Sequence, residues 1–138
     1  MSLPEVLEKF QFLNRIILAT VEGDQPRLRP VTLINLDGRL LVTTGTQSDK
    51  IKQILDNPKV EFLLLIPDDK GNTGYIRGKC IAVLVEERSI KTILFEKVPH
   101  VSQLWKNIDD DKLTVIELIP AEYDYMKPGV FLSTLIPA

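Results

Sequence analysis

The pair Asp37-Gly38 lies between two runs of apolar and β-branched residues, a pattern typical of a tight β-hairpin. The run before it, in residues 28–34, predicts one strand, with an interruption or bulge near Pro30 because proline lacks a backbone donor. Residues 40–44 predict the returning strand. A short hairpin requires antiparallel pairing, so we expect this chain to build an antiparallel sheet.

Further strands and short helices are expected on both sides of this hairpin. The alternating and apolar runs predict strands at residues 16–21, 60–66, 75–85 and 113–119, with a possible short last strand at 122–126. Helical spacing and end signals predict helices at residues 4–14, 48–57 and 86–108, the last broken near Pro99.

The order of these elements favours a mainly β fold, an antiparallel barrel with flanking helices, over a doubly wound parallel sheet. The length of 138 residues is usual for one domain, so we expect a single domain over residues 1–138. In the helix that follows Ser48, the spacing of Ile51, Ile54 and Leu55 predicts one apolar face packed in the core.

Composition argues against several classes of protein. The formal net charge is −2 and neither half of the chain is strongly basic, so we expect no nucleic-acid partner and no membrane-surface role. The longest apolar run, residues 62–66, is too short to span a bilayer, and we expect a cytoplasmic protein. Cys80 is the only cysteine and His100 the only histidine, so a zinc site is not expected.

The segment around the third strand carries the pattern that points to a ligand. Thr43, Thr44 and Ser48 place hydroxyl groups around a strand-to-helix turn, where free backbone N–H groups favour anions. Lys50 lies in the first helical turn, where a cation is unfavourable unless an anion is bound nearby. Arg29 on the neighbouring strand has a side chain that can bind the same anion. The simpler alternative is that Ser48 is only a helix cap and Lys50 only a solvated charge.

The same residues carry a resemblance to a known family. An Arg on the second strand, a hairpin, a Thr-rich third strand, a Ser-x-Lys helix start and an Asn-Pro follow one another as Arg29, Asp37-Gly38, Thr43-Thr44, Ser48-Asp49-Lys50 and Asn57-Pro58. This ordered set resembles the pyridoxamine 5'-phosphate oxidase-like superfamily of FMN-binding split barrels, over about residues 10–86. The resemblance implies a six-stranded antiparallel split barrel that binds FMN as a homodimer, with the cofactor at the interface between the subunits.

The resemblance also implies a set of cofactor-binding residues. Arg29, Ser48 and Lys50 would hold the FMN phosphate, and Thr43 and Thr44 would border the phosphate and the ribityl chain. The backbone around Val31, Thr32 and Leu33 would line the flavin ring. No catalytic residue is assigned.

The chain also departs from the family pattern. Asp49 stands where relatives often have a second basic residue, and the C-terminal region lacks the Arg, His and Trp that hold a pyridoxal substrate. We therefore do not expect oxidation of pyridoxamine phosphate.

Several functions remain open on this reading. The first is an FMN-dependent oxidoreductase that acts on a small molecule, with NAD(P)H as a possible electron donor that visits transiently, because no dinucleotide-binding fingerprint is present. The others are a flavin-binding module without turnover, the same barrel with a deazaflavin or haem, and an interaction protein without a ligand.

A few other residues invite a functional reading. For His100 a surface or packing role is favoured over a proton donor, and for Trp105 a core role over stacking on a ring. The run Asp109-Asp110-Asp111 is expected to be a solvated turn and Cys80 to be buried. Tyr123 and Tyr125 alternate on one face, either at a dimer contact or beside a flavin.

Overall fold

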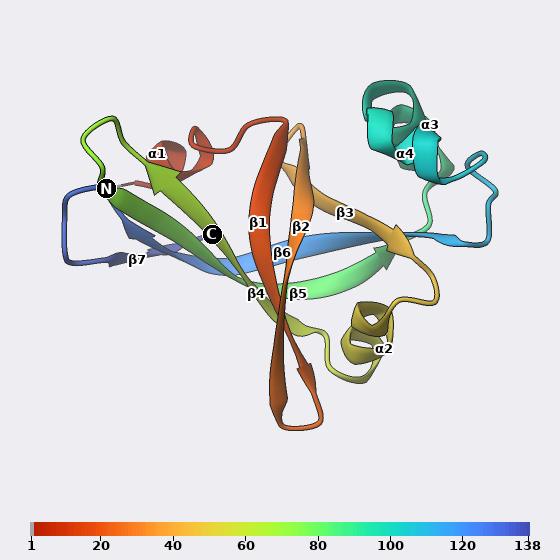
Figure 1. Cartoon of the computed structure of the whole chain (residues 1–138), viewed down its shortest axis with the longest axis horizontal. Coiled ribbons are helices and arrows are strands. Elements are labelled where there is room, and N and C mark those ends of the chain that lie inside the picture. The colour runs from red at the N-terminus through yellow and green to blue at the C-terminus, as the bar shows by residue number, and fades with distance from the viewer. Residues whose placement is uncertain (1) are drawn as a thin grey trace.

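The fold is a closed antiparallel barrel with short helices at its two ends, described for residues 2–138 by a computed structural model (Figure 1). Its elements in chain order are α1 (Leu3–Leu7), β1 (Leu13–Glu22), β2 (Gln25–Leu36), β3 (Arg39–Gly45), α2 (Asp49–Asp56), β4 (Lys59–Pro67), β5 (Thr73–Val85), α3 (Arg88–Lys97), α4 (Pro99–Leu104), β6 (Leu113–Met126) and β7 (Thr134–Pro137).

The strands follow the order β3-β2-β1-β4-β5-β6-β7, and a further pairing of β3 with β6 closes the first six into a barrel. That pairing runs from Leu40 opposite Leu118 to Gly45 opposite Leu113. The six-stranded split barrel with flanking helices is therefore confirmed. The seventh strand, β7, is a short addition that pairs with the outer part of β6.

The Asp37-Gly38 hairpin is confirmed and joins β2 to β3 through a two-residue turn. Both residues have positive φ, 50° for Asp37 and 91° for Gly38, as the tightest hairpin turn requires. Asn35 supports the turn because its Oδ1 accepts a hydrogen bond from the Gly38 N–H at 3.0 Å.

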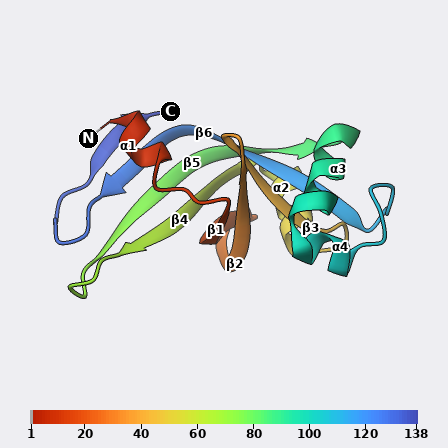
Figure 2. The ribbon, with the colours of Figure 1, turned by 90° about the horizontal axis from the view of Figure 1, so that it is seen from above.

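Two apolar clusters fill the molecule. The first lies inside the barrel and includes Phe10, Phe62 and Tyr123, whose rings contact one another, together with the buried face of α2. The second lies between the barrel wall and the α3–α4 pair, around Leu41 and Leu94. Figure 2 shows the result, an elongated molecule with α1 and β7 at one end and α2, α3 and α4 at the other.

Several expected boundaries differ from the structure. The first helix ends at Leu7 rather than near residue 14, although Ser2 caps it as its spacing with Glu5 suggests. No interruption occurs at Pro30, because β2 pairs continuously with β1 from Gln25 to Ile34. The strand expected at 113–119 and the short one at 122–126 are a single strand, with an irregularity opposite Lys79 and Cys80. The strand β7 was not expected.

The expected apolar face of α2 is wrong in its orientation. Ile51 and Ile54 are buried, but Leu55 is 63% exposed and Gln53 is only 6% exposed. The helix is turned so that Gln53 faces β1 and β2, where Thr20 and Arg29 donate hydrogen bonds to it. Polar partners on β1 and β2 therefore determine which side of α2 faces inward. The spacing of apolar residues in the sequence does not reveal such partners.

We predict that Ile54→Ala destabilises the protein, whereas Leu55→Ala has little effect. Truncating a buried Ile or Leu costs about 2–5 kcal/mol, while a surface substitution usually stays within about 0.5 kcal/mol. Urea unfolding of the two variants, which lie side by side on one helix, provides the comparison. An equal loss of stability in both would show that Leu55 is buried in the protein in solution.

Candidate functional site

An opening between β2 and β3 defines the candidate site. The two strands pair only where Ile34–Leu36 meets Arg39–Leu41, and beyond this β3 continues along β6 while β2 remains paired with β1 alone. Because backbone groups alternate in direction along a strand, the N–H and C=O of Thr32 point toward this open edge, as those of Ile34 point toward β3. Pro30 lies on the same edge and contributes no N–H there.

A pocket of about 390 Å³ lies where the β1–β2 hairpin meets the start of α2. Its volume lies within the usual range of small-molecule sites. It is lined by Glu22, Arg27, Leu28, Arg29, Ser48, Asp49, Lys50 and Gln53. The pocket thus combines two side chains of the predicted second strand, Leu28 and Arg29, with the predicted Ser-x-Lys helix start.

Hydroxyl groups and an ammonium group form a short network on the α2 side of the pocket. The Lys50 Nζ donates to Thr44 Oγ1 at 2.6 Å, and Thr44 Oγ1 lies 3.1 Å from Ser48 Oγ. Ser48 stands at the N-cap of α2, yet its hydroxyl caps no backbone N–H of the helix. If Thr44 donates its hydrogen to Ser48, the Ser48 hydrogen remains for a ligand, and two of the three Lys50 donors remain as well.

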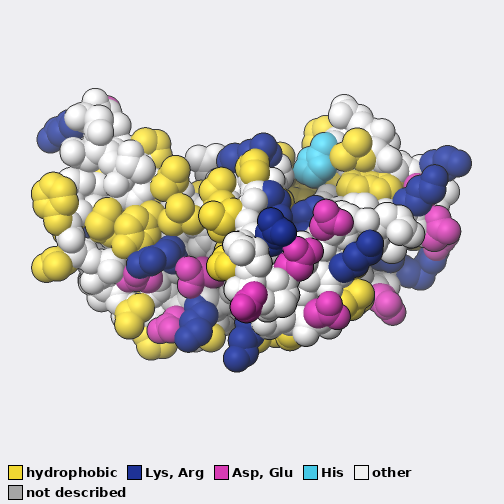
Figure 3. Space-filling view, turned by 60° about the horizontal axis from the view of Figure 1, so that its bottom comes forward, with side chains coloured by type: hydrophobic (Ala, Val, Ile, Leu, Met, Phe, Trp, Pro, Cys, Tyr) yellow, Lys and Arg dark blue, Asp and Glu magenta, His cyan; other side chains and the backbone are white. Residues whose placement is uncertain are grey.

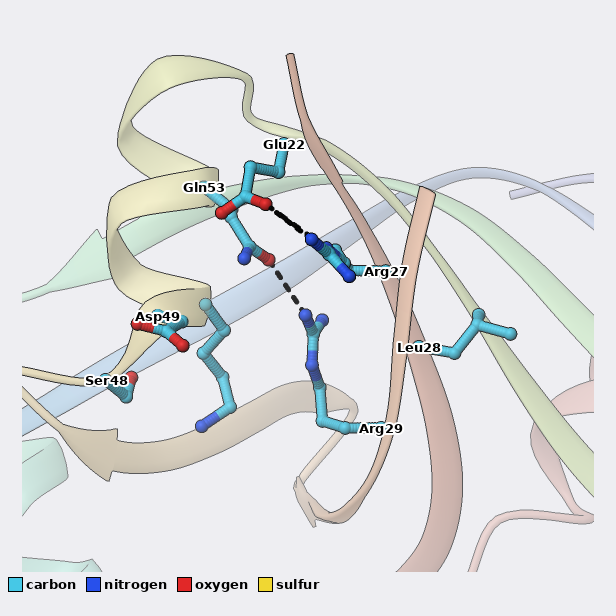
Figure 4. Close-up of a pocket in the computed structure, with 8 residues that line it drawn as sticks. Glu22, Arg27, Leu28, Arg29, Ser48, Asp49 and Gln53 are labelled. Carbon is cyan, nitrogen blue, oxygen red and sulfur yellow. Dashed lines mark hydrogen bonds and ion pairs between the residues drawn. The ribbon is translucent and has the colours of Figure 1, made fainter. Parts of the chain in front are cut away.

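Arg29 reaches the pocket from β2. Its Nη1 donates to the carbonyl oxygen of Leu18 at 3.3 Å, and its Nη2 donates to Gln53 Oε1 at 2.8 Å. Figure 4 shows the guanidinium crossing from β2 toward α2, with Ser48 and Asp49 at the start of the helix beyond it. Both of its partners are neutral, so the positive charge of Arg29 is not cancelled by either hydrogen bond.

The electrostatics of the pocket favour an anion. Burial, and then repulsion from Arg29, lower the pKa of Lys50, while Asp49 opposes the shift. Burial, and then repulsion from Arg27, lower the pKa of Arg29. Glu22 is engaged by Arg27, whose nitrogen lies 2.8 Å from its carboxylate. Among residues 2–138, neither Arg29 nor Lys50 forms an ion pair, so two neighbouring cations lack a counter-charge in direct contact.

The structure brings together only part of the predicted cofactor set. Arg29, Thr44, Ser48 and Lys50 converge as expected. Thr43 faces the opposite side of β3, where its Oγ1 lies 3.5 Å from His100 Nε2.

The β2 residues of the predicted set also divide between two faces. The side chains of Val31 and Leu33 belong to the barrel core, and Thr32 lies on the other face of β2. In the space-filling view of Figure 3, the chain's one histidine borders a hollowed part of the surface, with basic side chains nearby. The contact of Thr43 with His100 and the contact of Thr44 with Lys50 therefore lie on opposite sides of β3.

The other candidate residues from the sequence make their contacts within the fold and do not line the pocket. Tyr123 and Tyr125 are buried in the core, and burial raises the pKa of Tyr123 to about 12. Cys80 is buried as expected. Trp105 packs partly against the α3–α4 cluster, and its Nε1 donates to the Lys112 carbonyl. Asp110 accepts hydrogen bonds from two backbone N–H groups, as in a solvated turn.

Burial lowers the pKa of His100, which favours a neutral imidazole.

No group of three or more His, Cys, Asp or Glu side chains in the described part of the chain is placed to hold a metal ion. Likewise, none of the helices formed by residues 2–138 is long and apolar enough to cross a membrane.

Sequence reasoning missed Gln53 and Thr20. Both are buried, and the Thr20 hydroxyl donates to Gln53 Oε1 at 2.5 Å. A signal was available, since Gln53 lies three residues after Lys50 and therefore on the same side of the helix. Gln53 is also a polar residue next to Ile54, one of the apolar residues that α2 buries.

Comparison with known proteins identifies the family. Residues 3–127 match the family described as pyridoxamine 5'-phosphate oxidase. This match covers most of the chain and agrees with the split-barrel topology described above. The chain belongs to the pyridoxamine 5'-phosphate oxidase family. No curated protein sequence matches it significantly.

Several solved structures share the fold. A NimC/NimA family protein from Clostridium acetobutylicum is 25% identical, with 97% of this chain and 90% of that chain covered and a TM-score of 0.74. An FAD-binding protein from Mesorhizobium loti is 12% identical, with 89% and 90% covered and a TM-score of 0.72. A heme binding protein from Mycobacterium smegmatis is 16% identical, with 89% and 53% covered and a TM-score of 0.73. The fold is thus shared by proteins named for flavin and for haem.

We predict that Lys50→Met does not lower, and can raise, the melting temperature of the ligand-free protein. The pKa of Lys50 is depressed in the fold, so its charged form is disfavoured there, and this cost is present in full at pH 7 and fades as the pH rises through the depressed pKa toward 10.5. Inorganic phosphate should then stabilise the wild type but not the variant.

The exposed Lys52, changed to Met, is the matched control, since phosphate also acts on proteins without binding. Thermal melts at several phosphate concentrations measure both effects. A lower melting temperature of Lys50→Met without ligand would contradict the electrostatic argument.

Proposed function

We propose that this protein binds FMN in the opening between β2 and β3 and acts as an FMN-dependent oxidoreductase on a small molecule. The observation that carries the proposal is the pair Arg29 and Lys50, two partly buried cations from different elements that converge on one pocket without an ion-pair partner among residues 2–138. A phosphate monoester supplies the charge that this arrangement lacks.

In this proposal the phosphate contacts Arg29, Ser48 and Lys50, and Thr44 lies behind them as their hydrogen-bond partner. The ribityl chain and the flavin ring extend into the opening, where the backbone of Thr32 has an N–H and a C=O free for a planar ring. The side chains of Val31 and Leu33 pack in the core and support that backbone from behind, so only their backbone faces the ring in this proposal. Thr43 does not contact the phosphate in this proposal, because its side chain faces His100 on the opposite side of β3.

FMN supplies the hydride and electron chemistry when it is bound, so the chain itself needs to hold the cofactor, orient it and limit its contact with water. A nicotinamide dinucleotide is the proposed electron donor. The residues that other family members use for a pyridoxal substrate are not found in the C-terminal region of this chain, so a different small molecule is proposed as substrate.

We test the phosphate contacts with Arg29→Ala and Lys50→Ala. Each variant is expected to weaken FMN binding about tenfold to a hundredfold, because a charge-assisted hydrogen bond contributes about 1.5–3 kcal/mol. Riboflavin lacks the phosphate, so its binding should change little. Fluorescence-quench titrations with both ligands measure the difference, and Lys52→Ala is the matched control on the exposed side of α2.

Equal losses for FMN and riboflavin would mean that Arg29 and Lys50 act through folding. No loss for FMN in either variant would remove the phosphate site from the proposal.

Haem is a second candidate for the ligand of this opening, because the fold is shared with a protein named for heme binding. The visible spectrum of the freshly purified protein separates the candidates, since oxidised flavin, deazaflavin and haem absorb differently. With flavin present, turnover of NADH or NADPH distinguishes an oxidoreductase from a flavin-binding module that carries out no reaction.

We also propose that the protein is a homodimer whose partner subunit covers part of the cofactor. The outer faces of β5 and β6 carry an exposed apolar patch, in which Ile81 lies opposite Ile119 and Val83 lies beside them. Exposed apolar surface of this kind is typical of a contact with another chain. Light scattering at micromolar concentration should give twice the monomer mass, with and without FMN. A monomer under both conditions would refute the dimer.

A further inference from the structure

Gln53 is the most deeply buried side chain of the cationic pocket, and it joins three separate elements. From α2 it accepts hydrogen bonds from Thr20 on β1, at 2.5 Å, and from Arg29 on β2, at 2.8 Å. Both bonds end on the same atom, Oε1. A single amide oxygen thus connects the helix that carries Lys50 to the strand that carries Arg29.

The orientation of this amide is determined by its partners. A guanidinium can only donate hydrogen bonds, so the atom that faces Arg29 must be the oxygen of Gln53 and not its nitrogen. The nitrogen end is then directed to the other side, toward Glu22, whose pKa is lowered mainly by its hydrogen bond with Arg27. In Figure 4 the Gln53 side chain lies between Glu22 and Arg29.

Two contacts fix the plane of the Arg29 guanidinium. One N–H donates to the carbonyl of Leu18 and one to Gln53, which leaves three of its five N–H groups for other acceptors. A planar fork held at two points is oriented before a ligand arrives, so less conformational entropy is lost on binding. Because both partners are uncharged, the fork keeps its full positive charge.

We infer that Gln53 is a positioning residue for anion binding, which holds the Arg29 guanidinium toward the pocket without neutralising it. This inference rests on the proposed phosphate site and adds a residue that does not touch the phosphate itself. The choice of an amide matters chemically. A glutamate would have the same length, but it would form an ion pair with Arg29, repel a phosphate and lie next to Glu22.

The test is a double-mutant cycle read through FMN and riboflavin binding. Gln53→Met keeps the length of the side chain and removes the acceptor, and it should weaken FMN binding about three- to tenfold with riboflavin unchanged. In the Arg29→Ala background the same change should have no further effect, because the group that Gln53 positions is then absent. Gln53→Glu should weaken FMN binding about as much as Arg29→Ala. Gln103→Met, on the exposed surface of α4, is the matched control.

Each outcome separates this inference from the proposed function. If Arg29→Ala weakens FMN binding but Gln53→Met causes the same loss in both backgrounds, Gln53 acts through the fold and the inference is overturned, while the phosphate site stands. If Arg29→Ala leaves FMN binding intact, both fail. If Gln53→Met does not fold, Gln53→Glu decides, since it preserves size and acceptor. Loss of FMN binding with riboflavin binding retained supports the inference, and equal loss of both overturns it.

Discussion

The pairing of β3 with β6 is the constraint on which the rest of the structure depends. It closes the barrel, and in doing so it takes β3 away from β2 after only three residue pairs. The two strands that are joined by the two-residue Asp37-Gly38 turn therefore separate within a few residues. The opening that results exposes one edge of β2 and places the end of β3 beside α2. A flat continuous sheet with the same strands would have no such opening.

The charges in the pocket at the end of this opening are electrostatically unfavourable in the ligand-free protein. Lys50 and Arg29 are partly removed from water and repel each other, and the nearby carboxylate of Glu22 is engaged by Arg27 instead. The fold tolerates the two charges because neutral acceptors, namely the Thr44 hydroxyl, the Leu18 carbonyl and the Gln53 amide, satisfy part of their hydrogen-bonding capacity. The two charges are therefore held in place without a ligand, and their repulsion lowers the stability of the ligand-free protein.

Local signals in the sequence predicted the hairpin and the convergence of Ser48, Lys50 and Arg29, since each depends on short-range geometry. The orientation of α2 could not be read from apolar spacing, because the buried Gln53 is stabilised by side chains that lie 33 and 24 residues away. The strand β7 is a four-residue segment whose pairing depends on the position of β6. The opposite directions of Thr43 and Thr44 could have been inferred, since adjacent strand residues always face opposite sides.

The exposed edge of β2 has a further consequence for how copies of this protein can meet. Pro26 and Pro30 both fall at positions whose backbone donors would point outward along that edge, so the edge offers carbonyl groups there but no matching N–H groups. A polypeptide strand that tried to extend the sheet at this edge would lose a hydrogen bond at each proline. A small planar molecule, which needs only one or two such bonds, meets no such obstacle. The same edge can therefore admit a ring system while resisting strand exchange and fibrous aggregation.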